Sequence, residues 1–132
     1  MLGQQIGESK GKRLVRRVLS TEPPKVEVSF EDSGTLMGFS GNGFGTYTAT
    51  VRPDGSIFGD GEGIMAFADG EAVTWRGTAV GKFGDGGAVS YRGMLFYRTG
   101  SQKLAALNNI CGAFEFEADP AGNLSTKVWE WK

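Results

Sequence analysis

Four charged residues in the middle of the chain have the types and the spacing that acid–base chemistry requires. Asp60 and Glu62 stand two positions apart, so on a β-strand both carboxylates would point to one side, about 7 Å from each other. Arg76 and Arg92, on the segments that follow, carry the charge needed to hold an anionic or carbonyl-bearing substrate. The same residue types also form ordinary cross-strand salt bridges on exposed sheets. The four residues therefore predict either a catalytic polar site or a surface ion pair.

The sequence lacks the residues that other common kinds of catalytic or metal site require. The chain contains no histidine, which removes the commonest general base and most zinc sites. Cys111 is the only cysteine, so no internal disulfide forms. The Gly-x-Gly runs at 41–45 and 59–63 lack the ending of a phosphate-binding loop, and the aspartates at 54, 69 and 85 stand at turn positions that favour Asp for backbone reasons. We expect neither a metal nor a cofactor.

Four five-residue segments with glycine at the fourth position are expected to form the turns between strands, and so to set how the strands that carry these side chains pair. They are residues 52–56, 67–71, 83–87 and 119–123. The pattern is typical of a three-residue hairpin loop, a type I turn followed by a glycine at positive φ. Such a loop pairs its two flanking residues, so we expect residue 52 opposite 56, 67 opposite 71, 83 opposite 87, and 119 opposite 123.

Alternation of apolar and polar residues predicts antiparallel strands through most of the chain. A strand around Val26–Phe30 is expected to break at 32–34, before another strand opens at 41–43. Long strands are expected at about 56–67, 71–83 and 87–99, followed by a hairpin of about 110–119 and 123–131. Residues 11–20 fit a strand or a short helix, and 103–109 fit a helical turn, a strand or a loop.

These elements predict an all-β fold in one domain, residues 1–132. About eight or more antiparallel strands without a long helix form either a barrel or a sandwich. We favour a single antiparallel meander barrel, because consecutive hairpins bring sequence neighbours together and closure removes the exposed edges.

The expected pairings divide the central strands into two faces. Between the turns, the odd-numbered residues carry no charge, whereas the even-numbered ones include Glu62 paired with Arg76. A charge-free aromatic face loses more free energy in water, so we expect the odd face to line the interior. It holds Tyr47, Met65, Trp75 and Tyr91, with a row of glycines at 61, 77 and 93. Those glycines let a sheet bend beneath aromatic rings or leave room for a ligand.

Charge and hydropathy narrow the range of partners and locations. The net charge of −1 argues against nucleic-acid binding, and the basic run at 12–17 fits a basic patch or a solvated strand face. No apolar run is long enough to span a membrane, and the N-terminus does not have the pattern of a secretory signal. We therefore expect a cytoplasmic protein without membrane contact. Trp129 and Trp131 share a charged face with Glu115, which indicates cover by the N-terminal strands or by another subunit.

Several stretches resemble a family of small, functionally uncharacterised microbial proteins. They lie at 52–63, 87–93, 103–109, 114–117 and 127–131, and the similarity runs from about residue 25 to the end. The layout also resembles allene-oxide-cyclase-like and lipocalin-like barrels, although the lipocalin Gly-x-Trp signature near the N-terminus is absent. The resemblance implies a closed antiparallel barrel with an internal cavity and assembly into homo-oligomers.

Three functions remain open at this point. The first is binding of a small, mainly apolar ligand in a cavity near Trp75, Tyr91, Tyr47 and Met65. The second is a cyclase- or isomerase-like reaction that uses Glu62 and Arg76. The third is a filled, ligand-free barrel that acts only through subunit contacts. A cavity large enough for a ligand separates the first two functions from the third.

Overall fold

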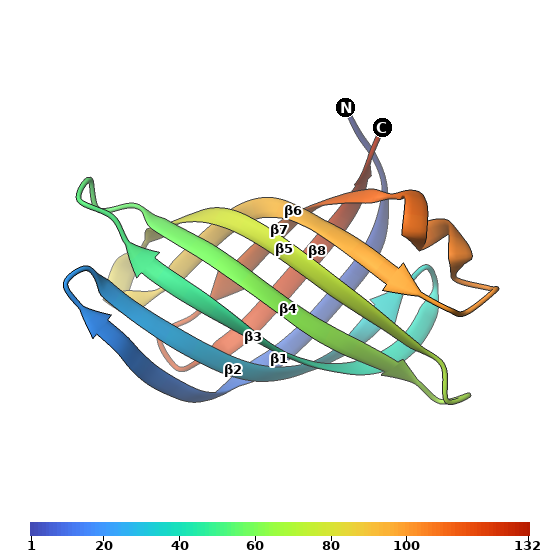
Figure 1. Cartoon of the computed structure of the whole chain (residues 1–132), viewed down its shortest axis with the longest axis horizontal. Helices are drawn as coiled ribbons and strands as arrows, with labels where there is room; N and C mark the ends of the chain where they lie inside the picture. The colour runs from blue at the N-terminus through green and yellow to red at the C-terminus, as the bar shows by residue number, and fades with distance from the viewer.

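The computed structural model describes residues 1–132 and forms a closed barrel of eight antiparallel strands in chain order (Figure 1). Each strand pairs with its sequence neighbours, and β8 pairs with β1 to complete the ring. The predicted all-β meander barrel is confirmed. The strands are β1 (Leu2–Thr21), β2 (Pro24–Leu36), β3 (Phe39–Val51), β4 (Ile57–Phe67), β5 (Ala72–Phe83), β6 (Val89–Thr99), β7 (Cys111–Ala118) and β8 (Asn123–Trp131), with short 3-10 helices η1 (Asp85–Gly87) and η2 (Ala105–Asn109).

Three of the four glycine turns have the predicted geometry. Gly55, Gly70 and Gly122 have φ values of 87°, 87° and 89°, a region that glycine occupies without steric cost. In each turn the two flanking residues are hydrogen-bonded, as in the 2.8 Å bond from the Arg52 amide to the Ser56 carbonyl. The turns therefore set the register of β3 with β4, β4 with β5 and β7 with β8 as expected, including the direct pairing of Glu62 with Arg76.

The turn between β5 and β6 departs from the prediction. Phe83 pairs with Val89 rather than with residue 87, because the connection is a five-residue loop with two consecutive glycines, Gly86 and Gly87, at positive φ. The register therefore shifts by two residues, and Gly93 lies opposite Ala79 instead of Gly77. The predicted row of three glycines is therefore wrong in part: Gly61 lies opposite Gly77, but Gly93 does not continue the row on β6. A shift of two preserves the alternation of faces, so the division into inner and outer residues is unaffected.

The predicted break at residues 32–34 is also wrong. β2 continues to Leu36 and turns through Met37 and Gly38, whose φ values of 52° and 84° are those of a two-residue hairpin. Hydrogen-bonded partners on both sides hold this segment extended, since Gly34 lies opposite Ser9 of β1 and Gly41 of β3. The continuation places Asp32 inside the barrel wall instead of in a loop.

The two segments left open by the sequence are now defined. Residues 11–20 are part of β1, and the region 103–109 contains the 3-10 turn η2. Leu104 and Leu107 of that segment are fully buried and pack into the core cluster at the end of the barrel where both chain termini lie (Figure 1). Neither short helix has the length or the apolar character of a membrane-spanning helix.

The odd-numbered residues of the central strands face inward, as predicted. Val73 is 0% and Tyr91 4% exposed, whereas Val80 and Phe96 on the other face are 52% and 54% exposed. The inward side chains form two clusters, one around Leu104 near η2 and one around Phe30 towards the opposite end. The space between the two clusters is the candidate site.

The outer surface retains exposed apolar side chains. Trp131 is 51% exposed, and β1 loses its β8 partner beyond Lys12, where Leu14, Val15 and Val18 are exposed. The basic residues beyond Lys12 lie where β1 pairs with β2 alone, and Arg16 and Arg17 are exposed there. Assembly into a homo-oligomer stays a prediction.

Candidate functional site

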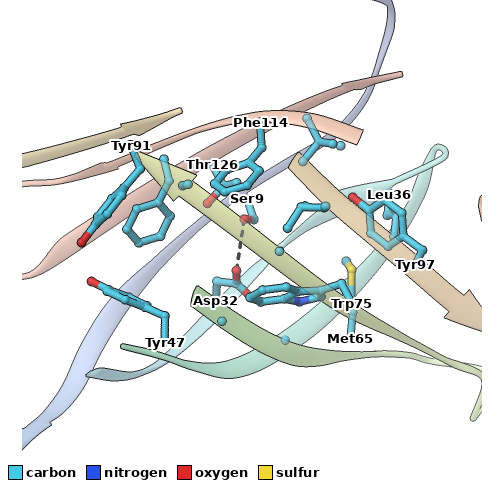
Figure 2. A pocket seen from close by; sticks show the side chains of 18 of the residues that line it. Ser9, Asp32, Leu36, Tyr47, Met65, Trp75, Tyr91, Tyr97, Phe114 and Thr126 are labelled. Atoms are coloured by element: carbon cyan, nitrogen blue, oxygen red, sulfur yellow. Dashed lines mark hydrogen bonds between the residues drawn. The ribbon is translucent and has the colours of Figure 1, made fainter. Parts of the chain in front are cut away.

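A cavity of about 130 Å³ lies inside the barrel between the two core clusters. Trp75 and Phe114 touch both clusters and so stand at the level of the cavity. All four residues expected near a ligand, Tyr47, Met65, Trp75 and Tyr91, line this one space (Figure 2). Their role in binding stays a prediction, but the barrel brings them together from four different strands.

Inward side chains that are partly exposed show where the inside of the barrel is hollow. Met65, Trp75 and Phe114 face inward yet are only half-buried, whereas Val73 and Leu95 of the same wall are buried. An inward side chain can retain accessible surface only where no protein atom packs against it. The centre of the barrel is therefore open, while the cluster that contains Leu104 and Leu107 is packed.

Glycines beneath the rings decide where the aromatic side chains fit. A Cβ atom added to Gly63 would lie 2.6 Å from the Trp75 indole, and one added to Gly81 would lie 2.6 Å from the Tyr91 ring. These distances are too short for real atoms, so each ring rests directly on glycine backbone. The high glycine content of the inner face thus makes room for large rings as well as for bending of the sheet.

Three aromatic rings close one side of the cavity. Tyr47 lies edge-on to both Tyr91 and Phe116, with ring centroids 5.9 Å and 5.6 Å apart, a favourable aromatic geometry. Burial raises the pKa of Tyr47 to about 12, against a smaller opposing effect of Arg13 and Arg16. Burial likewise raises the pKa of Tyr91 and of Tyr97. All three phenols are therefore neutral hydroxyl groups at physiological pH.

The cavity contains a polar pair that was not predicted from the sequence. Ser9 of β1 donates a 3.1 Å hydrogen bond to Oδ2 of Asp32 on β2, the one hydrogen bond among the lining side chains in Figure 2. Burial raises the pKa of the Asp32 carboxyl, against a smaller lowering by the Ser9 hydrogen bond. One signal could have revealed the residue: Asp32 continues the inward alternation of Val28 and Phe30.

The four catalytic candidates occupy the outer face. Glu62 and Arg76 form a 3.6 Å ion pair with side chains 69% and 78% exposed. The backbone of Asp60 borders the cavity between two inward glycines, but the residue is exposed and its side chain has outward parity. The β5–β6 register moves Arg92 away from the row of Asp60, opposite Val80. Arg92 pairs instead with Glu115 and Glu117, because the β6–β7 register places Glu115 directly opposite it. A catalytic role for these residues stays a prediction, separated from the cavity by the barrel wall.

No group of three or more His, Cys, Asp or Glu side chains has the arrangement of a metal site. The inward residues that bring polar groups to the cavity lining are Asp32, Ser9, Thr126, the three tyrosines and Trp75.

No family model and no curated protein sequence matches the chain. Solved structures do match its fold. A protein of unknown function from Clostridium acetobutylicum ATCC 824 has a TM-score of 0.85 at 15% sequence identity, covering 98% of each chain. A conserved protein of unknown function from Rhodopseudomonas palustris has a TM-score of 0.78 at 13% identity, covering 98% of this chain and 97% of its own.

A third similar structure is that of an enzyme from Penicillium herquei, with a TM-score of 0.69, 16% identity, and coverage of 96% of this chain and 92% of that chain. Similarity at these identities establishes a shared fold and carries no activity from one protein to another. The expected likeness to uncharacterised microbial β-barrel proteins is thus confirmed for the fold.

Proposed function

We propose that this protein binds a small, mainly apolar molecule inside the barrel, between the ring cluster of Tyr47 and Tyr91 and the side chains of Trp75 and Met65. The observation that carries the proposal is the aromatic-lined cavity of about 130 Å³. Binding sites for small molecules are concave, mostly apolar and fitted with a few polar groups, and this cavity has each of those properties.

The volume limits the size of the ligand. An engineered protein cavity of about 150 Å³ accommodates benzene. A molecule with one six-membered ring and a short substituent therefore fits here, whereas a long-chain lipid or a fused-ring compound would have to extend beyond this volume. The half-buried faces of Trp75 and Met65 supply the apolar surface that such a ring would cover.

Filling the cavity tests the proposal. Thr126 lines the cavity from β8, and Thr126→Phe would place a ring in the open space. We expect this variant to bind toluene, benzyl alcohol and related single-ring probes at least tenfold more weakly, as measured by isothermal titration calorimetry. Thr74→Phe on the exposed face of β5 is the matched control and should bind as the wild type does.

Native mass spectrometry of protein purified from its own source provides the second measurement. It reports a retained small molecule and the number of subunits in one spectrum. Equal binding by wild type and Thr126→Phe, or failure of every single-ring probe to bind the wild type, would contradict the proposed function.

A further inference from the structure

We propose that the cavity selects, among small apolar molecules, those that carry a protonated amine, and that the Asp32 carboxylate binds the ammonium group. This inference rests on the proposed function and names its ligand class: a small organic cation with an aromatic or aliphatic body. Four features of the structure support it.

The first feature is a niche in the barrel wall, formed by glycines, that holds the carboxyl group. Asp32 lies opposite Gly11 on β1 and Gly43 on β3, so neither neighbouring strand places a side chain beside it. A Cβ atom at Gly43 would lie 2.4 Å from Asp32 Oδ1, and one at Gly34 would lie 2.8 Å from the Cβ of Ser9. Any larger residue at these positions would displace the Ser9–Asp32 pair. The three glycines therefore form a niche in the barrel wall that fits this pair.

The second feature is a carboxylate without a cation. Asp32 takes part in none of the ion pairs of the chain, and Ser9 supplies its one hydrogen bond from a side chain. A carboxylate has about four acceptor positions, so most of its capacity is free. An ammonium group offers three donors and the opposite charge, which the niche lacks.

The third feature is the electrostatic character of the whole cavity. No lysine or arginine lines it, and the side chains that face Asp32 from the other walls, such as Trp75, Phe114 and Thr126, are uncharged. Among the titratable lining groups, the tyrosines stay neutral and Asp60 has outward parity. Arg13 and Arg16 are the nearby cations, and both oppose the larger rise that burial causes in the pKa of Tyr47. Arg13 pairs with the inward residue Phe30, but neither arginine lines the cavity or forms an ion pair with Asp32. Asp32 is therefore the one inward charged residue of the cavity lining. It attracts an organic cation and repels an anion.

The fourth feature is the set of aromatic rings that line the cavity with the carboxylate. Phe30 stands two residues from Asp32 on the same face of β2, and its ring lies 6.3 Å from that of Trp75. In Figure 2 the Ser9–Asp32 pair lies between the Tyr47 and Tyr91 rings on one side and Trp75 with Met65 on the other. Aromatic faces attract an organic cation through their quadrupoles while covering its apolar part. The rings would also cover the apolar part of a neutral alcohol or ketone, but they would not attract it as they attract a cation.

Benzylamine and benzyl alcohol provide the matched probes, because they differ only in the group that Asp32 would bind. We expect the wild type to bind benzylamine at least tenfold more tightly than benzyl alcohol at pH 7 by isothermal titration calorimetry, and benzoate least of all. Asp32→Asn should weaken benzylamine binding at least tenfold and change benzyl alcohol binding less than threefold. Thr126→Phe should lose both ligands.

The wild type alone gives a further test should Asp32→Asn fail to fold. Benzylamine affinity should fall as pH is lowered and Asp32 becomes protonated, while benzyl alcohol affinity stays constant, since benzylamine itself remains charged throughout. Equal or tighter binding of benzyl alcohol, or a flat benzylamine profile, overturns the amine inference but leaves the proposed function standing. Absence of binding by both compounds and by toluene overturns the two together.

Discussion

Asp32 and Glu62 are carboxylates of one barrel wall with opposite surroundings. Glu62 points outward from β4, has Arg76 3.6 Å away and is 69% exposed. Asp32 points inward from β2, has no cationic partner and accepts one hydrogen bond from Ser9. Water screens the outer pair, and such pairs contribute at most about 1 kcal/mol. The carboxylate that lacks a partner therefore has the stronger unsatisfied attraction for a ligand, because burial removes the water that would otherwise solvate it.

The same comparison shows why charge pattern alone misdirects a search for function. Opposite charges on paired strand positions draw attention, yet on an exposed sheet they satisfy each other. A lone carboxylate among glycines and aromatic residues has no visible partner in the sequence. Three variants test the difference between the two carboxylates, in order from the largest expected effect to the smallest.

Gly43→Ala should destabilise the inner site most. Its Cβ would lie 2.4 Å from Asp32 Oδ1, so the carboxyl group or the strand must move. We expect a loss of about 1–3 kcal/mol in the free energy of unfolding, the usual cost of overpacking, measured by urea denaturation. In an Asp32→Ala background the clash is absent and the cost should fall below about 1 kcal/mol. An equal cost in both backgrounds would show that Asp32 does not occupy the niche.

Asp32→Asn should stabilise the ligand-free protein at neutral pH. Burial raises the pKa of Asp32 in the folded state above its unfolded value of 3.8. At pH values between these two pKa values, the folded state holds a proton that the unfolded chain has released. The penalty for an ionised Asp32 is complete above the folded pKa, shrinks as pH falls, and vanishes below the unfolded pKa.

We expect Asp32→Asn to gain about 1 kcal/mol over the wild type at pH 7, a typical size for one substitution, and nothing near pH 3. The measurement is the difference in free energy of unfolding between the two proteins at several pH values. Taking the difference between the two proteins cancels the contributions of Asp54, Asp69 and Asp119. Hydrogen bonds lower the pKa of these carboxyl groups, chiefly those from Ser56 to Asp54, from Lys103 to Asp69 and from Asn123 to Asp119. A difference that grows towards acid pH would contradict the burial of an unpaired carboxylate.

Glu62→Gln combined with Arg76→Met should have the smallest effect. Both side chains face water, so we expect a change in stability within about 0.5 kcal/mol that shrinks further in high salt. Binding of single-ring probes should match the wild type. A tenfold loss of binding, or loss of a reaction found for the wild type, would restore these residues as members of the site.

Local chemistry accounts for the part of the structure that the sequence predicted. The loops at 52–56, 67–71 and 119–123 each place a glycine at positive φ, and an odd loop length pairs the flanking residues without help from the rest of the chain. Strand alternation then placed Trp75 and Tyr91 on one side of the sheet. Three of the four turns, the inner face and the set of cavity rings were predictable for this reason.

The fourth turn shows where local chemistry is insufficient. Residues 83–87 also have glycine fourth, but a second glycine follows, and both adopt positive φ in the longer loop. Two loop lengths are therefore sterically open to this segment, and the pairing of whole strands selects between them. The choice moves Arg92 out of the row of Asp60 and opposite Val80, whereas the β6–β7 pairing provides its partner Glu115.

The amino-acid sequence by itself determined the strands, most of their register and the face on which each aromatic ring lies, because these depend on steric preferences within a few residues. The tertiary structure decided that the strand continues through Asp32, and only that continuation extends the inward alternation of Val28 and Phe30 to this residue. Its Asp-Ser-Gly segment has the composition of a turn, and it stays extended because β1 and β3 pair with it from both sides. Those strands also supply Gly11 and Gly43, two of the three glycines that leave room for the carboxyl group, and both are distant from Asp32 in the sequence.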